Sequence, residues 1–463
     1  MLSDRYDPMN LFELVPKLRL EMDPVLAQLD RLLDDDTLFS RVRADLARRY
    51  PHTQTLGRHS TPVEVILRML IVKRLYGFSY EQTEQFVSDS LVLRQFCRLY
   101  LEPAPDDTTL IRWANLIGPK TLEQLNDRVV ELARSLKVTR GRKLRVDSFV
   151  VETNIHHPSD SSILGDGVRV LSRLLRRAKK VVGEGAELGK EAFRTRTRST
   201  RRLAQQMHRL ARRKGEEVTA QMKGAYERLI EVVKKTQAQA QRVCGVLRTQ
   251  TQGSAKQLVA QFEHYLPLVE QALCQTVVRV IKEKAVASKE KILSLFEPHS
   301  QVVVRHKAGK PVEFGRKLWL NEVDGGIISS YALVDGGGTD APYLAGSLEE
   351  HERLFGKAPW LLAGDRGVSS PENEKRAQEA GVKRVVLPCV GKAPPGRVEQ
   401  ERSGWFRRGF RFRAGIEGRI SVLQRKYGLE RCLDHGEDGM GRWVGWGIVT
   451  ANLAKIGQTV AAR

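Results

Sequence analysis

The sequence predicts an α/β protein with a helical N-terminal domain, followed by a domain of strands and helices that contains a long helical insertion. Three observations lead to this prediction. Apolar residues follow helical spacing up to about residue 140, β-branched segments begin at Lys143 and return after residue 300, and a strongly basic segment separates them. A chain of 463 residues is too long for one ordinary core, which agrees with several domains.

The composition excludes some classes of protein. The formal net charge is +22, so a phosphate-rich polymer is the expected partner. The longest apolar run, Val63–Leu75, is interrupted by Arg68 and Lys73 and therefore predicts a core helix, and we expect no membrane partner. The N-terminus lacks the pattern of a signal peptide, and the five cysteines form no CxxC pair. Reduced thiols in a cytoplasmic, nucleoid-associated protein are the expectation.

Residues 1–140 predict a helical N-terminal domain with several helix start signals. Thr61 would be a helix cap with Pro62 at the first helical position, and Ser79–Gln82 repeats the capping-box pattern. Asp107 starts another helix, and Gly118 with the following proline ends it. Short helices joined by tight turns occur both in DNA-binding helix-turn-helix domains and in ordinary helical bundles. Binding of DNA ends by this domain is one of two open interpretations.

A basic helical insertion is predicted over residues 168–296. Residues 168–250 contain 22 Lys and Arg against 7 Glu and no Asp, a net charge of +15, and no proline. This composition predicts a long helical hairpin, which is either a solvated spacer or a clamp along a DNA backbone. A spacer needs no such bias in sign, so we favour the clamp. The DNA-binding candidates here are Arg173, Arg176, Arg177, Lys179 and Lys180.

Strands and helices of the third region surround this insertion, in residues 141–167 and 297–463. The predicted elements are a strand at 144–151, a hairpin of strands at 317–323 and 327–334, a helix at 340–355, a strand at 360–363, a helix from 370 to 381, a strand at 384–387 and a helix ending near 428. The strand–helix–strand crossover implies parallel pairing. This order of elements is that of a ribonuclease-H-like domain.

Three carboxylates have positions that indicate chemistry. Asp147 lies within the first strand, where burial among apolar residues is costly without a cation or donors. Asp365 follows the end of a parallel strand, the edge at which open α/β sheets bind ligands. Glu417 lies on the last of these helices, four residues after Arg413, so both point the same way. Each signal alone also fits a turn residue or a surface ion pair, but their joint order is more specific.

Three carboxylates suit hydrolysis of a phosphodiester. The reaction must neutralise charge on both the attacking and the leaving oxygen, and two Mg²⁺ ions about 3.5–4 Å apart can do this. Asp and Glu oxygens are the ligands that such hard ions prefer. Metal-activated water, or a DNA 3′-hydroxyl, then needs no histidine base. An arginine beside the site would hold a phosphate.

Five blocks of the chain, in the same order, resemble DDE transposases of bacterial insertion sequences, in particular the IS five-like group with an InsH-type N-terminal domain. The blocks are Thr61–Phe96, Val146–Ser148 followed by Pro158–Asp160, Phe314–Lys317, Ala363–Gly367 and Arg413–Ile420, and the segment Trp443–Leu453 is similar to the family's C-terminal helix. The resemblance implies that Asp147, Asp365 and Glu417 are catalytic and bind two Mg²⁺ ions, for which Mn²⁺ can substitute. It also implies DNA contacts at Arg413 and Arg366.

The chain departs from this family at two positions near the glutamate. Phe410 stands where the family has tyrosine, and Gln424 stands where it has lysine. Phe410 can stack on a base but cannot hydrogen-bond a phosphate. Arg425 and Lys426 are candidates to replace the missing cation from an adjacent face. These departures bear on strand transfer more than on metal binding.

The implied function is DNA transposition of the cut-and-paste type, in which element ends are nicked and joined to target DNA. The partners would be double-stranded DNA, both terminal repeats and target, and a second copy in a synapsed homodimer. Two other functions stay open. One is a nuclease of the same fold that never joins strands, and the other is a non-catalytic DNA-bridging protein. The second leaves the three carboxylates unexplained.

Overall fold

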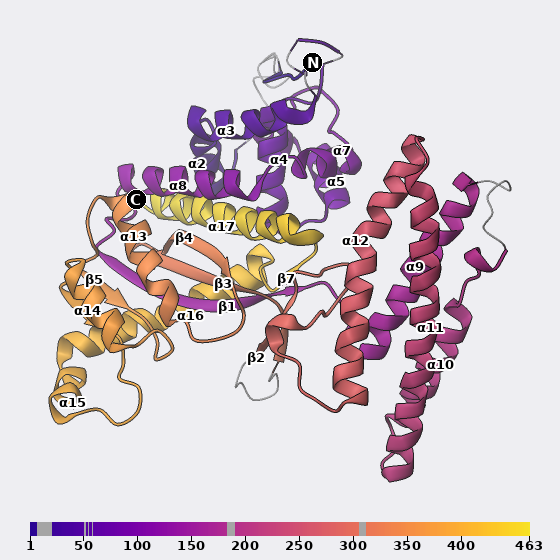
Figure 1. The fold of residues 1–463 in the computed structure, drawn as a ribbon. Coiled ribbons are helices and arrows are strands. Elements are labelled where there is room, and N and C mark those ends of the chain that lie inside the picture. Colours follow the sequence, from indigo (N-terminus) through magenta and orange to yellow (C-terminus); the bar gives the residue numbers. More distant parts are fainter. Residues whose placement is uncertain (7–20, 51, 54, 58, 183–189, 305–311) are drawn as a thin grey trace. The chain divides into compact units, whose positions relative to one another are not determined.

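The computed structural model describes residues 1–6, 21–50, 52–53, 55–57, 59–182, 190–304 and 312–463. These residues form two compact units, one made of Met1–Glu152 with Arg316–Arg463 and the other of Thr153–Gly315 (Figure 1). Both helices and strands are present, in agreement with the α/β class. In the described part of the chain, no helix has the length and apolar character needed to cross a bilayer.

The N-terminal part of the first unit is helical, as predicted. Its helices are α2 (Pro24–Leu32), α3 (Asp36–Leu46), α4 (Val63–Tyr76), α5 (Tyr80–Asp89), α6 (Leu91–Phe96), α7 (Asp107–Ala114) and α8 (Pro119–Ser135). The capping box at Ser79 is confirmed, because its hydroxyl accepts from the backbone of Gln82 and the Gln82 side chain accepts in return. One detail was wrong. Pro62 is the cap residue itself, with extended backbone, and α4 begins one residue later.

One mixed sheet carries the candidate residues. Its strands are β1 (Lys143–Thr153), β2 (Gln301–Val304), β3 (Val312–Val323), β4 (Ile327–Val334), β5 (Leu361–Ala363), β6 (Arg384–Val386) and β7 (Arg431–Cys432). β1 lies between β3 and β5, with β4 beyond β3 and β6 beyond β5. The predicted hairpin is confirmed as the antiparallel pair of β3 and β4. The predicted parallel pairing is confirmed for β5 with β6, and β1 also pairs with β5 in parallel.

Helices cover this sheet and fix the position of its central strand. They are α13 (Leu344–Phe355), α14 (Pro371–Glu379), α15 (Pro395–Arg402), α16 (Gly404–Tyr427) and α17 (Gly436–Ala461). Phe149 and Val151 of β1 pack with residues of α16 and α17 in one cluster. Leu144 and Val146 belong to a different cluster that includes residues of α13. Because side chains alternate along a strand, β1 is buried on both faces.

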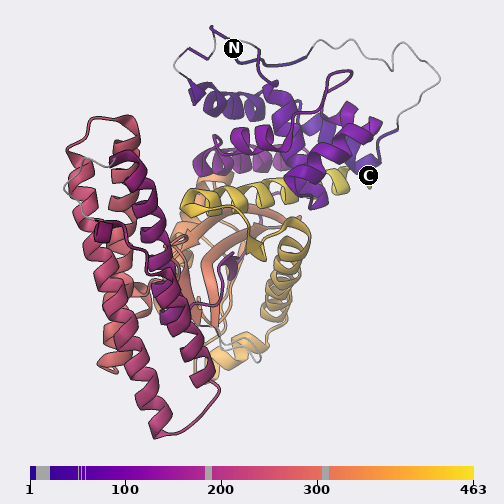
Figure 2. The same ribbon diagram turned by 90° about the vertical axis from the view of Figure 1, so that its right-hand side faces the viewer.

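In its described residues, the second unit contains four long helices. They are α9 (Asp160–Val182), α10 (Thr197–Leu210), α11 (Glu216–Arg248) and α12 (Gly253–Thr276), and Figure 2 shows α9, α11 and α12 side by side. The predicted single hairpin was therefore wrong. A break before α11 is made by Gly215, whose φ of 130° suits glycine, and residues 249–252 separate α11 from α12. Apolar residues from all four helices share one core.

Candidate active site

Asp147 lies near the middle of β1 and is almost completely buried, at 8% exposed. Side chains along a strand alternate in direction, so Asp147 shares a face with Phe149 and Val151. These two residues pack against α16 and α17. The Asp147 carboxylate therefore points to the side of the sheet on which α16 lies.

The position of Asp365 follows from the pairing of β1 with β5. These strands are parallel, with Arg145 opposite Ala363. Asp147 and Asp365 each come two residues later, so a continued register brings them side by side. Beyond β5 the chain turns, and the backbone N–H of Val368 donates to an Asp365 carboxylate oxygen at 3.2 Å.

Glu417 and Arg413 lie one turn apart on α16, as their spacing predicted. Arg413 Nη1 donates to Glu417 Oε1 at 2.8 Å, and Arg413 Nη2 donates to Asp147 Oδ2 at 2.9 Å. The same Nη2 lies 3.9 Å from an oxygen of Asp365. One half-buried guanidinium thus contacts all three predicted catalytic carboxylates. Glu417 is the most open of them, with its side chain 68% exposed.

Two glycines allow α16 to lie close to the sheet. A Cβ atom at Gly409 would lie 2.5 Å from Cγ2 of Val386 on β6. A Cβ atom at Gly415 would collide with the guanidinium of Arg145. Arg145 is itself fixed, because its Nε donates to Glu322 at 2.8 Å and its Nη1 donates to a backbone carbonyl of α16 at 2.5 Å. This close packing brings Arg413 within reach of β1.

The environment of Asp147 disfavours its charge. The pKa of this carboxyl is raised to about 6, chiefly by burial and to a smaller extent by the carboxylates of Asp365 and Asp340, against the lowering effects of Arg413 and a backbone N–H. Repulsion between neighbouring carboxylates contributes to this shift, but burial is the larger cause.

Asp340 and Lys317 extend the site and were missed in the sequence. Ser148 alternates with Asp147 and faces the opposite side of β1, where its Oγ donates to Asp340 Oδ2 at 2.8 Å. Lys317 of β3 makes an ion pair with Asp340, and both side chains are nearly buried. A lysine within an apolar strand could have indicated a buried carboxylate partner. No local signal identified Asp340.

A basic cavity of about 870 Å³ opens beside Asp365. Its lining includes four arginines and an exposed aromatic ring: Arg366, Arg407, Arg411 and Arg413, with Phe410 at 45% exposed. Arg413 therefore faces the three carboxylates and this cavity at once. Concentrated guanidinium groups with an exposed ring suit a phosphate backbone and its bases.

The other predicted DNA-binding residues lie elsewhere. Arg425 and Lys426 are in the last turn of α16 and line a different cavity, so the structure does not bring them to the carboxylates. The five candidates in the insertion share the exposed surface of α9, at Arg173, Arg176, Arg177, Lys179 and Lys180. Their helix belongs to the second unit.

The candidate metal ligands at this site are the oxygens of three carboxylates, and these carboxylates surround the Arg413 guanidinium. Across the described ranges, no three His, Cys, Asp or Glu side chains form a group that could hold a metal ion. The three carboxylates instead meet the Arg413 guanidinium. Carboxylate oxygens are hard donors, the kind of ligand that Mg²⁺ prefers.

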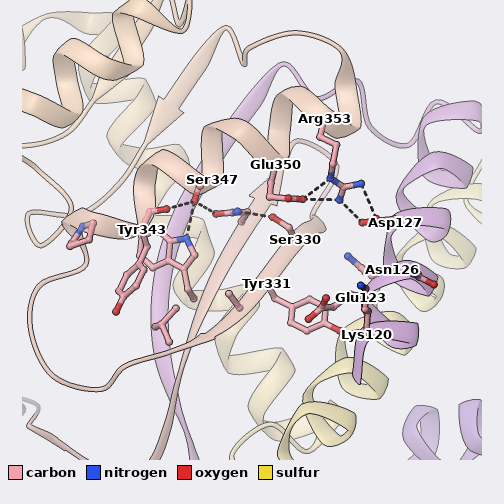
Figure 3. Close-up of a pocket in the computed structure, with 17 residues that line it drawn as sticks. Lys120, Glu123, Asn126, Asp127, Ser330, Tyr331, Tyr343, Ser347, Glu350 and Arg353 are labelled. Carbon is pink, nitrogen blue, oxygen red and sulfur yellow. Dashed lines mark hydrogen bonds and ion pairs between the residues drawn. The ribbon is translucent and has the colours of Figure 1, made fainter. Parts of the chain in front are cut away.

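A further cavity, of about 570 Å³, lies between α8, the β3–β4 hairpin and α13 (Figure 3). Arg353 joins its two sides by contacting Asp127 and Glu350. On the other wall Trp319 donates to Ser347. No predicted site residue lines this cavity, and its polar contacts hold α8 to α13 and the sheet.

Comparison with known proteins supports a transposase family. Residues 14–116 match the model of a transposase domain, DUF772. A Rhizobium meliloti protein described as "Uncharacterized protein ORF8 in nfe locus" is 28% identical over 159 residues, which cover 33% of this chain and 74% of that protein. No solved structure matches. The matched segment spans α2 to α7 and supports a transposase family.

Proposed function

We propose that this protein is a DNA transposase of the DDE type, with a ribonuclease-H-like catalytic domain. The observation that carries the proposal is the meeting of Asp147, Asp365 and Glu417 at one arginine, from three separate elements. The order of strands supports the fold, since β4, β3, β1, β5 and β6 lie side by side with β1 central. The IS five-like assignment rests on the motifs around these three residues.

The carboxylates would hold two Mg²⁺ ions, or Mn²⁺ in their place. These ions would neutralise charge on the attacking and leaving oxygens of a phosphodiester. Asp147 is fixed by its strand and Asp365 by the turn after β5, whereas Glu417 is exposed and adjusts more easily. In the reaction, a water oxygen forms a bond to phosphorus while the bond to the DNA 3′-oxygen breaks, which frees a 3′-hydroxyl. That hydroxyl then attacks a target phosphorus and displaces its 3′-oxygen.

DNA would be positioned by the basic surfaces. Arg413 and Arg366 adjoin the carboxylates and the basic cavity, where they would hold phosphates near the reacting bond. Phe410 offers an exposed ring for stacking on a base. The exposed cations of α9 would contact the backbone of the terminal repeats. Cut-and-paste transposition brings two ends together, so the working form would be a dimer.

The alternative within the same fold is a nuclease that does not join strands. The test uses end-containing DNA that is already cleaved and carries a free 3′-hydroxyl, mixed with a target duplex and Mg²⁺. A transposase yields a joined product. Cleavage of intact ends without any joining would support the nuclease, and metal-dependent nicking of any kind would exclude a bridging protein without catalysis.

A further inference from the structure

A ladder of three stacked aromatic rings lies where α4 meets α5. Tyr76 and Phe78 have ring centroids 5.4 Å apart and planes inclined by 17°, and Phe78 and Phe86 are 4.6 Å apart at 20°. Phe78 lies between the other two rings. Tyr76 and Phe86 stay 45% and 43% exposed, so the ends of the ladder are open to solvent.

The turn between the helices builds this ladder. α4 ends at Tyr76, and Gly77 takes a left-handed conformation, with φ of 72°, that few other residues adopt. Ser79 then caps α5. The turn is therefore short and defined, and it places Phe78 between the last residue of α4 and a ring on α5. A rigid turn holds the rings in position before any partner arrives.

A cavity of about 730 Å³ adjoins Tyr76, and two cations line it. Arg425 and Lys426 come from the last turn of α16 and are exposed. Asp23 is the acid in the lining. Its carboxylate already accepts from the backbone N–H groups at the start of α2, which offset part of its charge. The cavity therefore keeps positive charge beside an open aromatic ring.

We propose that this cavity binds an unpaired nucleotide of a DNA strand. A base would stack on the open face of Tyr76 and extend the ladder, and its phosphate would meet Arg425 and Lys426. Stacking platforms flanked by cations are the general means of holding single strands without sequence preference. The proposal rests on DNA as the substrate, and it adds a site apart from the three carboxylates. It also gives a role to two cations that do not reach Glu417.

The experiment is photocrosslinking of the full-length protein to a single-stranded oligonucleotide that contains 5-bromodeoxyuridine. Excess unlabelled duplex is present to occupy general DNA-binding surfaces, and mass spectrometry locates the adduct. We expect an adduct at Tyr76. Binding of the same oligonucleotide, measured by fluorescence anisotropy, should weaken about tenfold in Tyr76→Ala and stay near wild type in Tyr76→Phe.

Matched variants test the two halves of the site separately. Tyr50→Ala removes a ring that is 58% exposed elsewhere, and the double variant Lys375→Gln/Arg376→Gln removes two adjacent exposed cations of α14. Both should bind like wild type, whereas Arg425→Gln/Lys426→Gln should bind more weakly. Adducts only at other residues, or equal affinities for Tyr76→Ala and Tyr50→Ala, would overturn the proposal.

A nicking assay on the same preparations separates this inference from the proposed function. Protein that crosslinks at Tyr76 but never nicks DNA would support the nucleotide site and count against the transposase. Protein that nicks normally while Tyr76→Ala binds single strands like wild type would overturn only the nucleotide site.

Discussion

Arg413 donates a hydrogen bond of 2.9 Å to Asp147, although 266 residues separate them in the chain. The bond joins α16 to the central strand of the sheet, and the same guanidinium reaches Glu417 and Asp365. A buried carboxylate is costly unless it is paired, and a buried arginine likewise. Each therefore favours the position of the other, and the three carboxylates are held around one point before substrate binds.

The raised pKa of Asp147 predicts a pH-dependent penalty on stability. Its folded pKa of about 6 lies above the ordinary value of 3.8, so the folded state binds this proton more tightly. The free energy of unfolding should therefore fall as pH rises from about 4 to 6, and the loss should be complete above that range. Without metal, Asp147→Asn should be more stable than wild type at pH 8 by about 3 kcal/mol.

Urea unfolding in EDTA at several pH values measures this difference, which should vanish near pH 4. Glu352→Gln, which removes an exposed acid of α13, is the control and should match wild type throughout. A stability gain in Asp147→Asn that does not change with pH would contradict the assignment.

Close packing of α16 predicts opposite effects of alanine at two of its glycines. Gly409→Ala would drive a methyl group into Val386 and should destabilise the protein by about 1–3 kcal/mol. Gly418 has no atom within 4 Å of its would-be Cβ, so Gly418→Ala should be neutral or stabilise by up to about 1 kcal/mol. Thermal unfolding of both variants is the measurement. Equal effects would mean that α16 does not lie against β6 as described.

The α9 cations should dominate the salt dependence of DNA binding if they follow a DNA backbone. Neutralising Arg173, Arg176, Arg177, Lys179 and Lys180 together should weaken binding to all duplexes alike. It should also flatten the log–log salt slope by about 0.9 for each phosphate that the protein no longer neutralises. Exchanging arginine and lysine at the same five positions keeps the charge and should keep the slope. An unchanged slope in the neutral variant would leave the helix as a spacer.

Gln424 offers a gain-of-function test. It lies seven residues after Glu417, about 10 Å further along α16. Arg425 and Lys426 line a different cavity from the one beside Asp365. Gln424→Lys should raise the yield of strand transfer by up to about tenfold and leave metal affinity unchanged. Gln424→Met controls for loss of the amide. A fall in yield with lysine would show that this position does not face DNA.

Local signals in the sequence were enough to find the central strand, the hairpin and the helix that carries Glu417. Asp147 was detectable because a charge in an apolar strand needs partners, and Arg413 with Glu417 because four residues make one helical turn. Parallel pairing of β5 with β6 followed from the helical crossover between them. These features depend on neighbours in sequence or on general rules of chain connection.

Contacts between segments that are far apart in the sequence could not be predicted from the sequence. Lys317 and Asp340 meet only once β3 and the segment before α13 are placed, so the position of Lys317 indicates a buried acidic partner but does not identify Asp340. The insertion has a helical composition throughout, and its breaks at Gly215 and residues 249–252 do not stand out among similar residues. Arg425 and Lys426 line the cavity beside Tyr76 because α16 ends there. The spacing of residues along α16 could not predict that Tyr76, from a distant segment, lies next to them.

The most direct test of the catalytic assignment compares wild type with Asp147→Asn, Asp365→Asn and Glu417→Gln. Each protein is first shown to be folded by circular dichroism and to bind end-containing DNA, because the basic surfaces are unchanged. Nicking and joining are then measured in Mg²⁺ and in Mn²⁺. We predict that each amide variant loses both reactions together by at least about a hundredfold, since one set of carboxylates serves both. Normal cleavage by Glu417→Gln, or loss of joining without loss of nicking, would contradict the assignment.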